Sequence, residues 1–153
     1  HRSSTFLAKT YPNIQPSFRV LIYSKESLVA HTALFRVSVI VGDDVILIGG
    51  VGMTLSLMQG YNLGFMVRKM VSELAALKGC PIAIGRVQNT TPVKAKLEPL
   101  VHTFLDIPMI GETTRSHEWE TLAIYKTTET SAADELIEYF RVAKSVTIAG
   151  EVY

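Results

Sequence analysis

A short glycine-containing turn between a strand-like and a helix-like segment constrains the fold of this chain most strongly. The turn, Gln59-Gly60-Tyr61-Asn62-Leu63-Gly64, follows the apolar run 45–57 and precedes apolar side chains with helical spacing. The predicted inner face of that helix contains Leu63, Met66, Val67, Met70, Val71, Leu74 and Leu77. A helix N-terminus after such a turn can hold an anion, because its first N–H groups are unpaired and its dipole favours negative charge. Gly60 and Gly64 lack a Cβ and Asn62 tolerates a positive φ, so the backbone can wrap closely around a phosphate.

Three strands are predicted before this turn. Residues 18–24, 28–41 and 45–54 are rich in β-branched and aromatic side chains, and turn residues separate them at 25–27 and 42–44. The third strand contains the cluster Gly49-Gly50-Val51-Gly52, which is unusual because glycine weakens a strand interior. We therefore expect a bulge there, or the close approach of another backbone or a ligand.

The second half of the chain continues with alternating helices and strands. The first helix is expected to end near Lys78-Gly79, and residues 81–87 form the next strand. Helical spacing over 92–105 is interrupted by Pro99. Strands are predicted at 109–113 and 120–126, joined by the polar loop 114–119, in which His117 and Trp119 could line a substrate pocket. Ser131 is expected to cap a last helix with Leu136, Phe140 and Ala143 inside. The order predicts an α+β fold, a mixed and mostly antiparallel central sheet flanked by helices, in a single domain 1–153 with its core at 18–126 and a helix and tail at 131–153.

This order of elements resembles the GNAT superfamily of N-acyltransferases over residues 18–126. Members bind acyl-CoA through an (Arg/Gln)-x-x-Gly-x-(Gly/Ala) turn, in which Gln59 and Gly64 match the first and last positions and Asn62 replaces the central glycine. The resemblance implies an acyl-CoA-dependent N-acyltransferase, most simply one that moves acetyl from acetyl-CoA to a primary amine of a small molecule or a protein. It also implies that part of the family's N-terminal region is missing, because the first convincing strand begins at Phe18 and only a helix end is expected at 3–9.

The resemblance assigns roles to individual positions. Backbone N–H groups near Val51 and Met53 would polarise the thioester carbonyl. The turn residues Gln59, Gly60, Tyr61, Asn62, Leu63 and Gly64 would hold the pyrophosphate of CoA, and Asn89 would contact CoA after the next strand. His102 takes the place of the tyrosine that protonates the departing thiolate in many members, which a side chain with a pKa of about 6.5 can do.

The general base is less defined, since no carboxylate lies between Val45 and Met58. Glu112 and His31 are the nearest candidates by strand position. Direct attack of the amine on the thioester is expected, because no well-placed nucleophile for a covalent intermediate is apparent.

Composition and spacing exclude several other functions. The 15 Lys and Arg residues nearly balance the 14 Asp and Glu residues, so no nucleic-acid partner is implied. The apolar runs are too short to cross a membrane, and a single cysteine, Cys80, fits a cytoplasmic protein. No metal is expected, because four histidines and one cysteine show no ligand spacing. The pairs His31-Thr32 and His102-Thr103 do not fit the His-x-Thr pattern of two-histidine phosphodiesterases, because adjacent strand residues point to opposite faces.

Three alternatives stay open. A catalytically degenerate GNAT fold could act as a binding or interaction module, which gains support if His102 and Gln59 do not face one cleft. Residues 28–36, 73–77 and 81–83 resemble rhizobial nodulation N-acyltransferases, so the donor could be a long-chain acyl-CoA or an acyl carrier protein. The segments 146–148 and 152–153 could add an edge strand to a partner, which would make a homodimer.

Overall fold

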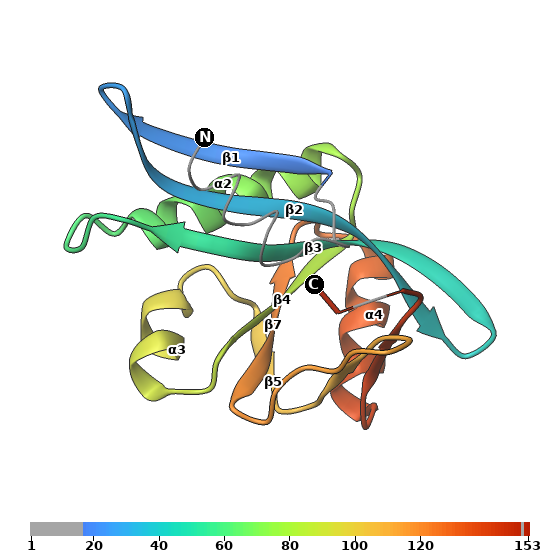
Figure 1. The fold of residues 1–153 in the computed structure, drawn as a ribbon. Coiled ribbons are helices and arrows are strands. Elements are labelled where there is room, and N and C mark those ends of the chain that lie inside the picture. Colours follow the sequence, from blue (N-terminus) through green and yellow to red (C-terminus); the bar gives the residue numbers. More distant parts are fainter. Residues whose placement is uncertain (1–16, 151) are drawn as a thin grey trace.

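The computed structural model describes residues 17–150 and 152–153, in which one twisted eight-stranded sheet is covered by three helices (Figure 1). The predicted helix end at 3–9 lies outside the described residues. The elements are β1 (Phe18–Ser24), β2 (Ser27–Val41), β3 (Asp44–Ser56), α2 (Leu63–Leu77), β4 (Ile82–Gln88), α3 (Thr91–Leu97), β5 (Thr103–Leu105), β6 (Met109–Ile110), β7 (Glu120–Lys126), α4 (Ser131–Val142) and β8 (Val146–Ile148).

The sheet is built on the long antiparallel hairpin of β2 and β3. Its strands are paired from Ala30 opposite Ser56 to Val41 opposite Asp44, and the connecting turn contains Gly42 with a φ of +62°. The strand order is β5-β7-β4-β3-β2-β8-β6, and β1 pairs with β2 in addition. β1 is antiparallel to the first half of β2, whereas β8 pairs with the second half at Val39 and Ile40. The predicted mixed, mostly antiparallel sheet is confirmed.

β3 and β4 part soon after they meet. They are parallel neighbours only where Gly49, Gly50 and Val51 lie opposite Ala83, Ile84 and Gly85. Beyond this point β3 continues to Ser56 and β4 continues to Gln88, where β4 is paired with β7 alone (Figure 1). The edge of β3 that faces β4 therefore carries backbone groups without a strand partner among the described residues from Gly52 onward.

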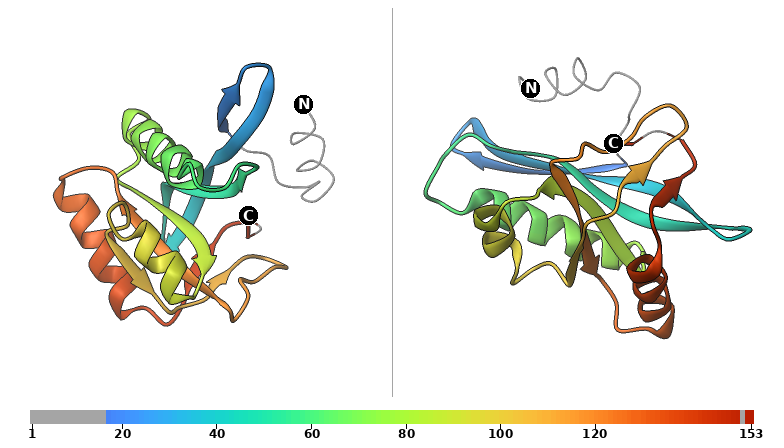
Figure 2. Two further views of the ribbon diagram at one scale, coloured as in Figure 1. Left: turned by 90° about the vertical axis from the view of Figure 1, so that its left-hand side faces the viewer. Right: turned by 90° about the horizontal axis from the view of Figure 1, so that it is seen from below.

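Alternate residues of the strands belong to two cores on opposite faces of the sheet. Leu34 and Ala83 pack with Val71 and Ala75 of α2. The neighbouring side chains Phe35 and Ile84, with others, pack with Leu136, Ile137 and Phe140 of α4. In Figure 2, α2 runs beside the half of the hairpin that carries β1, and α4 lies toward the half that carries β8.

Some boundaries and burial patterns differ from the sequence prediction. In α2, Met66, Met70 and Leu77 are exposed, and the buried stripe is Val67, Val71 and Ala75. The small side chain of Ala75 lets α2 pack closely against β3. Even a Cβ added to Gly49 of β3 would lie only 3.4 Å from the Ala75 Cβ.

Three further boundaries need correction. The helix predicted over 92–105 ends at Leu97, before Pro99, and the chain turns into β5, so His102 is not helical. The strand predicted over 109–113 is only Met109–Ile110. Thr130, not Ser131, caps α4, and Ala143 follows the helix end. Among the described helices, none is long and apolar enough to cross a membrane.

Candidate active site

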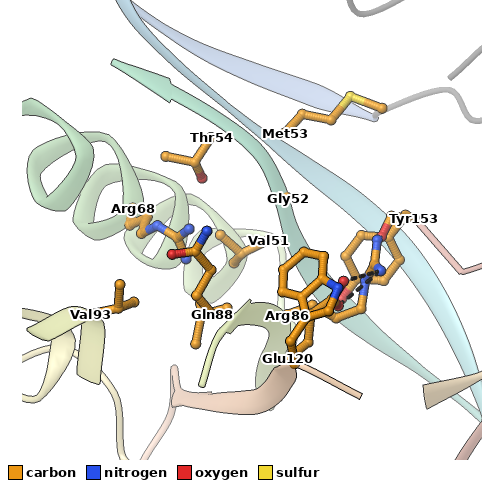
Figure 3. Close-up of a pocket in the computed structure, with 12 residues that line it drawn as sticks. Val51, Gly52, Met53, Thr54, Arg68, Arg86, Gln88, Val93, Glu120 and Tyr153 are labelled. Carbon is orange, nitrogen blue, oxygen red and sulfur yellow. Dashed lines mark hydrogen bonds and ion pairs between the residues drawn. The ribbon is translucent and has the colours of Figure 1, made fainter. Parts of the chain in front are cut away.

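The divergence of β3 and β4 opens a cavity of about 430 Å³ between the two strands, here called the strand cavity (Figure 3). It is lined by Val51, Gly52, Met53, Thr54, Arg68, Arg86, Val87, Gln88, Val93, Trp119, Glu120 and Tyr153. In Figure 3, Arg68, Thr54 and Val93 lie toward one end, and Arg86, Glu120 and Tyr153 lie toward the other.

A second cavity of about 580 Å³ adjoins it at the start of α2 and is called the turn cavity. Its lining is Thr54, Ser56, Met58, Gln59, Gly60, Asn62, Leu63, Gly64, Phe65, Arg68, Val93, Lys96 and Leu97. Thr54, Arg68 and Val93 line both cavities, so the two form one groove from the turn to the interior of the sheet.

The turn has the backbone geometry that its sequence predicted. Gly60 has a φ of +83° and Asn62 a φ of +55°. The Asn62 side chain does not cap α2, and the first turn of the helix has no acidic residue, so the free N–H groups there remain available to an anion. A Cβ on Gly64 would have no atom within 4 Å, and because Gly64 lines the turn cavity, the missing side chain leaves this space open.

Cations outnumber anions along the groove. Lys96 stands at the turn cavity, and Arg68 stands between the cavities, where its Nη1 donates to the Tyr125 hydroxyl at 3.0 Å. At the inner end, Arg86 Nη1 donates to both carboxylate oxygens of Glu120, at 3.1 and 2.9 Å. Arg86 Nε is buried and has no hydrogen-bond acceptor among the described residues.

A bulge in β3 forms one wall of the strand cavity. The pairing of β2 with β3 shifts between His31 and Ala33, so that Met53 and Thr54 together lie opposite Thr32. Met53 has a φ of +53°, which is uncommon for a residue with a side chain. The bulge lies just after the glycine cluster, whereas the sequence predicted a bulge or a close approach at the glycines themselves.

Two side chains of β2 hold this bulge. His31 Nδ1 donates to the Met53 carbonyl oxygen at 2.9 Å, and Thr32 Oγ1 donates to that of Gly52 at 3.2 Å. The Thr32 and Thr54 hydroxyls are also 2.9 Å apart. Burial lowers the pKa of His31, the hydrogen bond to Met53 opposes this effect, and the charge of Arg19 lowers the pKa further. His31 is therefore a buried, neutral hydrogen-bond donor.

The glycine cluster also accommodates an aromatic ring. A Cβ on Gly50 would lie 2.7 Å from Tyr153 Cζ, and one on Gly52 would lie 3.0 Å from Tyr153 Cδ2. The Tyr153 ring stacks on Phe35 with ring centroids 4.9 Å apart, and its hydroxyl donates to the Ile84 carbonyl oxygen at 2.6 Å. Burial raises the pKa of this hydroxyl, so it stays protonated.

The structure brings together most of the residues predicted to bind CoA. Val51 and Met53 line the strand cavity, and Gln59, Gly60, Asn62, Leu63 and Gly64 line the turn cavity. Tyr61 is 64% exposed and lies outside both linings. Asn89 also lies outside them, because its Nδ2 donates to Asp106 Oδ1 at 3.2 Å at a separate cavity.

The three predicted catalytic side chains are not gathered at the groove. His102 is exposed and lies just before β5, where its backbone N–H donates to the Ile124 carbonyl oxygen of β7. Glu112 is exposed on the loop after β6, with its N–H bound to the Gly150 carbonyl oxygen. His31 holds the bulge through Nδ1. His102 and Gln59 thus do not line a common cavity.

Several groove residues were missed from the sequence. Arg68, Arg86, Lys96, Glu120 and Tyr153 come from five different parts of the chain. Only Arg68 carried a local signal, since it lies about one helical turn after the glycine-containing turn 59–64. His117 and Trp119, predicted as possible pocket residues, stack with ring centroids 5.0 Å apart, and Trp119 lines the strand cavity.

No family model and no curated protein matches the chain. Solved structures do match its fold. A GNAT family N-acetyltransferase (YhbS) from Escherichia coli in complex with CoA matches with a TM-score of 0.57 and 8% identity, over 97% of this chain and 73% of that chain. A putative acetyltransferase, yncA, from Salmonella typhimurium with its cofactor acetyl-CoA matches with a TM-score of 0.53 and 11% identity, over 87% of this chain and 77% of that chain.

A GCN5-related N-acetyltransferase from Kribbella flavida matches with a TM-score of 0.48 and 16% identity, over 59% of this chain and only 22% of that longer chain. The two better matches establish that this chain has the fold of the GNAT N-acyltransferases, and the predicted fold is confirmed.

Proposed function

We propose that the protein is an acyl-CoA-dependent N-acyltransferase, most simply one that transfers acetyl from acetyl-CoA to a primary amine. The observation that carries this proposal is the continuous groove, in which Thr54, Arg68 and Val93 join the turn cavity to the strand cavity. A CoA thioester is long and carries its phosphates at one end and its acyl group at the other. The groove has an anion-binding turn at one end and an unpaired strand edge at the other. Structures of similar fold were solved with CoA and with acetyl-CoA.

The turn cavity is suited to the pyrophosphate. The N–H groups at the start of α2 are oriented by a turn that needs positive φ at Gly60 and Asn62, and Gly64 leaves room for the phosphate oxygens. Lys96 and Arg68 add positive charge from α3 and α2. These groups would hold the donor, while the unpaired edge of β3 would pair with its amide-containing arm.

The strand cavity is suited to the reaction. A neutral amine nitrogen attacks the thioester carbonyl carbon, a C–N bond forms and the C–S bond breaks. The amine proton passes, directly or through water, to the departing CoA sulfur, so that an amide and free CoA thiol are formed. Backbone N–H groups beside Val51 and Met53 would stabilise the oxyanion. Holding donor and amine together in one groove supplies much of the rate, so no covalent enzyme intermediate is required.

Two measurements test this proposal. Acetyl-CoA is titrated calorimetrically into the wild-type protein, and release of free CoA thiol is followed with mixtures of small amines and peptides as acceptors. We expect micromolar binding and amine-dependent thiol release. Absence of both heat and thermal stabilisation at 1 mM acetyl-CoA, roughly a thousand times a micromolar dissociation constant, would refute the acyl-CoA proposal.

A second candidate is an acyl-CoA-binding module without transfer activity. It is favoured by one observation, which is that His102 does not share a cavity with Gln59. This module would bind acetyl-CoA and would release no thiol above the uncatalysed rate with any acceptor. The same pair of measurements therefore separates the two candidates.

A further inference from the structure

We propose that Tyr153 closes the inner end of the strand cavity and restricts the donor to short acyl groups. This inference rests on the proposed function and specifies its substrate class. It concerns a residue outside the stretch 18–126 whose order of elements resembles acyltransferases in the sequence analysis, and it decides between acetyl and long-chain donors, which the sequence left open.

The direction of the groove places the acyl group near Tyr153. A donor whose pyrophosphate lies at the turn cavity enters the strand cavity past Thr54 and Arg68. Its acyl end then points toward the opposite end of the strand cavity, where Arg86, Glu120 and Tyr153 lie (Figure 3). Each added methylene lengthens the acyl group in that direction.

The Tyr153 ring fills the space at this end. It is 6% exposed, and it lies so close to β3 that only glycine fits at position 50, since a Cβ there would approach Tyr153 Cζ to 2.7 Å and Val37 Cγ2 to 2.6 Å. The ring also stacks on Phe35, with 4.9 Å between the ring centroids. The strand cavity, which the donor itself would occupy, borders the ring, and the close contacts with β3 and Phe35 restrict its movement away from that cavity.

Polar contacts hold the ring in place. The Tyr153 hydroxyl donates to the Ile84 carbonyl oxygen at 2.6 Å, at the point where β3 and β4 are still paired. Arg86 Nη2 donates to the Tyr153 carbonyl oxygen, and the same guanidinium is held by Glu120, whose side chain is 7% exposed. Displacing Tyr153 would leave buried polar groups unpaired, so a long acyl chain cannot push it aside without a large loss of affinity.

The test compares donor lengths in matched variants. Dissociation constants are measured for acetyl-, butyryl-, hexanoyl- and octanoyl-CoA with the wild type, Tyr153→Leu, Tyr153→Phe and Phe140→Leu. Phe140 is the control, because it is fully buried in the same core but lines neither cavity. Tyr153→Phe keeps the ring and removes only the hydroxyl. Thermal unfolding by circular dichroism verifies that each variant is folded.

For the wild type we expect octanoyl-CoA to bind at least about tenfold more weakly than acetyl-CoA. A closed pocket commonly distinguishes acyl groups that differ in length by even one methylene. Tyr153→Leu should reduce this ratio about tenfold, whereas Phe140→Leu and Tyr153→Phe should keep it within about threefold of wild type. If Tyr153→Leu does not fold, Tyr153→Met is used, because its flexible side chain fills the site less rigidly.

Three results would overturn the inference. Equal binding of octanoyl- and acetyl-CoA to the wild type shows that nothing limits chain length, while the proposed function survives. An equal gain for all donors in Tyr153→Leu shows that Tyr153 obstructs the groove without selecting length. Failure of every acyl-CoA to bind the wild type refutes the proposed function and this inference with it.

Discussion

The imidazole Nδ1 of His31 lies 2.9 Å from the carbonyl oxygen of Met53, so a buried side chain of β2 holds the strained residue of the β3 bulge. The carbonyl can only accept, which places the proton of the neutral imidazole on Nδ1. Met53 also lines the strand cavity, so this contact connects the core of the sheet with the wall of the proposed active site.

Replacing His31 by phenylalanine should destabilise the protein by about 1–3 kcal/mol, because the partly buried Met53 carbonyl loses its donor. Urea unfolding of wild type and variant measures the difference in the free energy of unfolding. His31→Gln is the matched control. Its amide can donate to the same oxygen, so it should lose less free energy of unfolding than His31→Phe does. Equal stability of wild type and His31→Phe would mean that the bulge does not depend on this bond.

The stability of the protein should decrease as the pH falls below about 6.5, the ordinary pKa of histidine. Burial lowers the pKa of folded His31, so below pH 6.5 the unfolded chain binds a proton that the folded chain does not, and unfolding is favoured. This effect amounts to at most about 1.4 kcal/mol per pH unit and ends once the pH passes below the folded pKa.

Urea midpoints between pH 8 and pH 5 measure this dependence, and the difference between wild type and His31→Phe isolates it from other titrating groups. The stability advantage of the wild type should shrink toward pH 5. An advantage that stays constant over this range would show that His31 titrates alike in the folded and unfolded states.

Replacing Gly64 by leucine should abolish acetyl-CoA binding without destabilising the fold. A side chain here meets no atom within 4 Å and would project into the turn cavity, while leucine has a better helix propensity than glycine by up to about 1 kcal/mol. Calorimetry and thermal unfolding give the two readouts. Ala95→Leu, on an exposed position of α3 outside both cavities, is the control and should bind as the wild type does. Unchanged binding by Gly64→Leu would place the phosphates elsewhere.

Breaking the Arg86–Glu120 ion pair should destabilise the protein by about 1–3 kcal/mol, less than for a fully buried pair because the Arg86 side chain is 19% exposed. Glu120→Gln leaves the guanidinium partly uncompensated, and Arg86→Met also removes the donor to Tyr153. A double-mutant cycle measured by urea unfolding should give a coupling free energy of at least about 0.5 kcal/mol. Strictly additive losses would mean that the two side chains do not stabilise one another.

Replacing His102 by alanine should leave acyl transfer within about twofold of wild type, because the side chain is exposed and lies outside both cavities. Steady-state thiol release with the best acceptor measures this. A loss of about a hundredfold or more, the usual contribution of a general acid, would restore the role that the resemblance suggested. Lys144→Ala, an exposed substitution just after the end of α4 and outside both cavities, controls for nonspecific loss.

Local chemistry made the conformation of the turn 59–64 predictable. Positive φ at Gly60 and Asn62 is a property of those residue types, and the change from strand to helix around them follows from side-chain periodicity. The error at 92–105 is also local. Helical spacing continues on both sides of Pro99, but a proline removes a backbone donor and its ring clashes with the preceding turn, and here the helix ends before it at Leu97.

The sequence alone determined most of the order of the elements, the turn, and an irregularity at the glycines of β3 (a bulge or a close contact), because these depend on residues that are neighbours in the chain. It could not identify that close neighbour as Tyr153, nor pair Arg86 with Glu120 or His31 with Met53. Such contacts join residues far apart in sequence, and they exist only once strand pairing and the bulge have set which side chains share a face. The tertiary structure therefore decided which residues line the groove and where the groove ends.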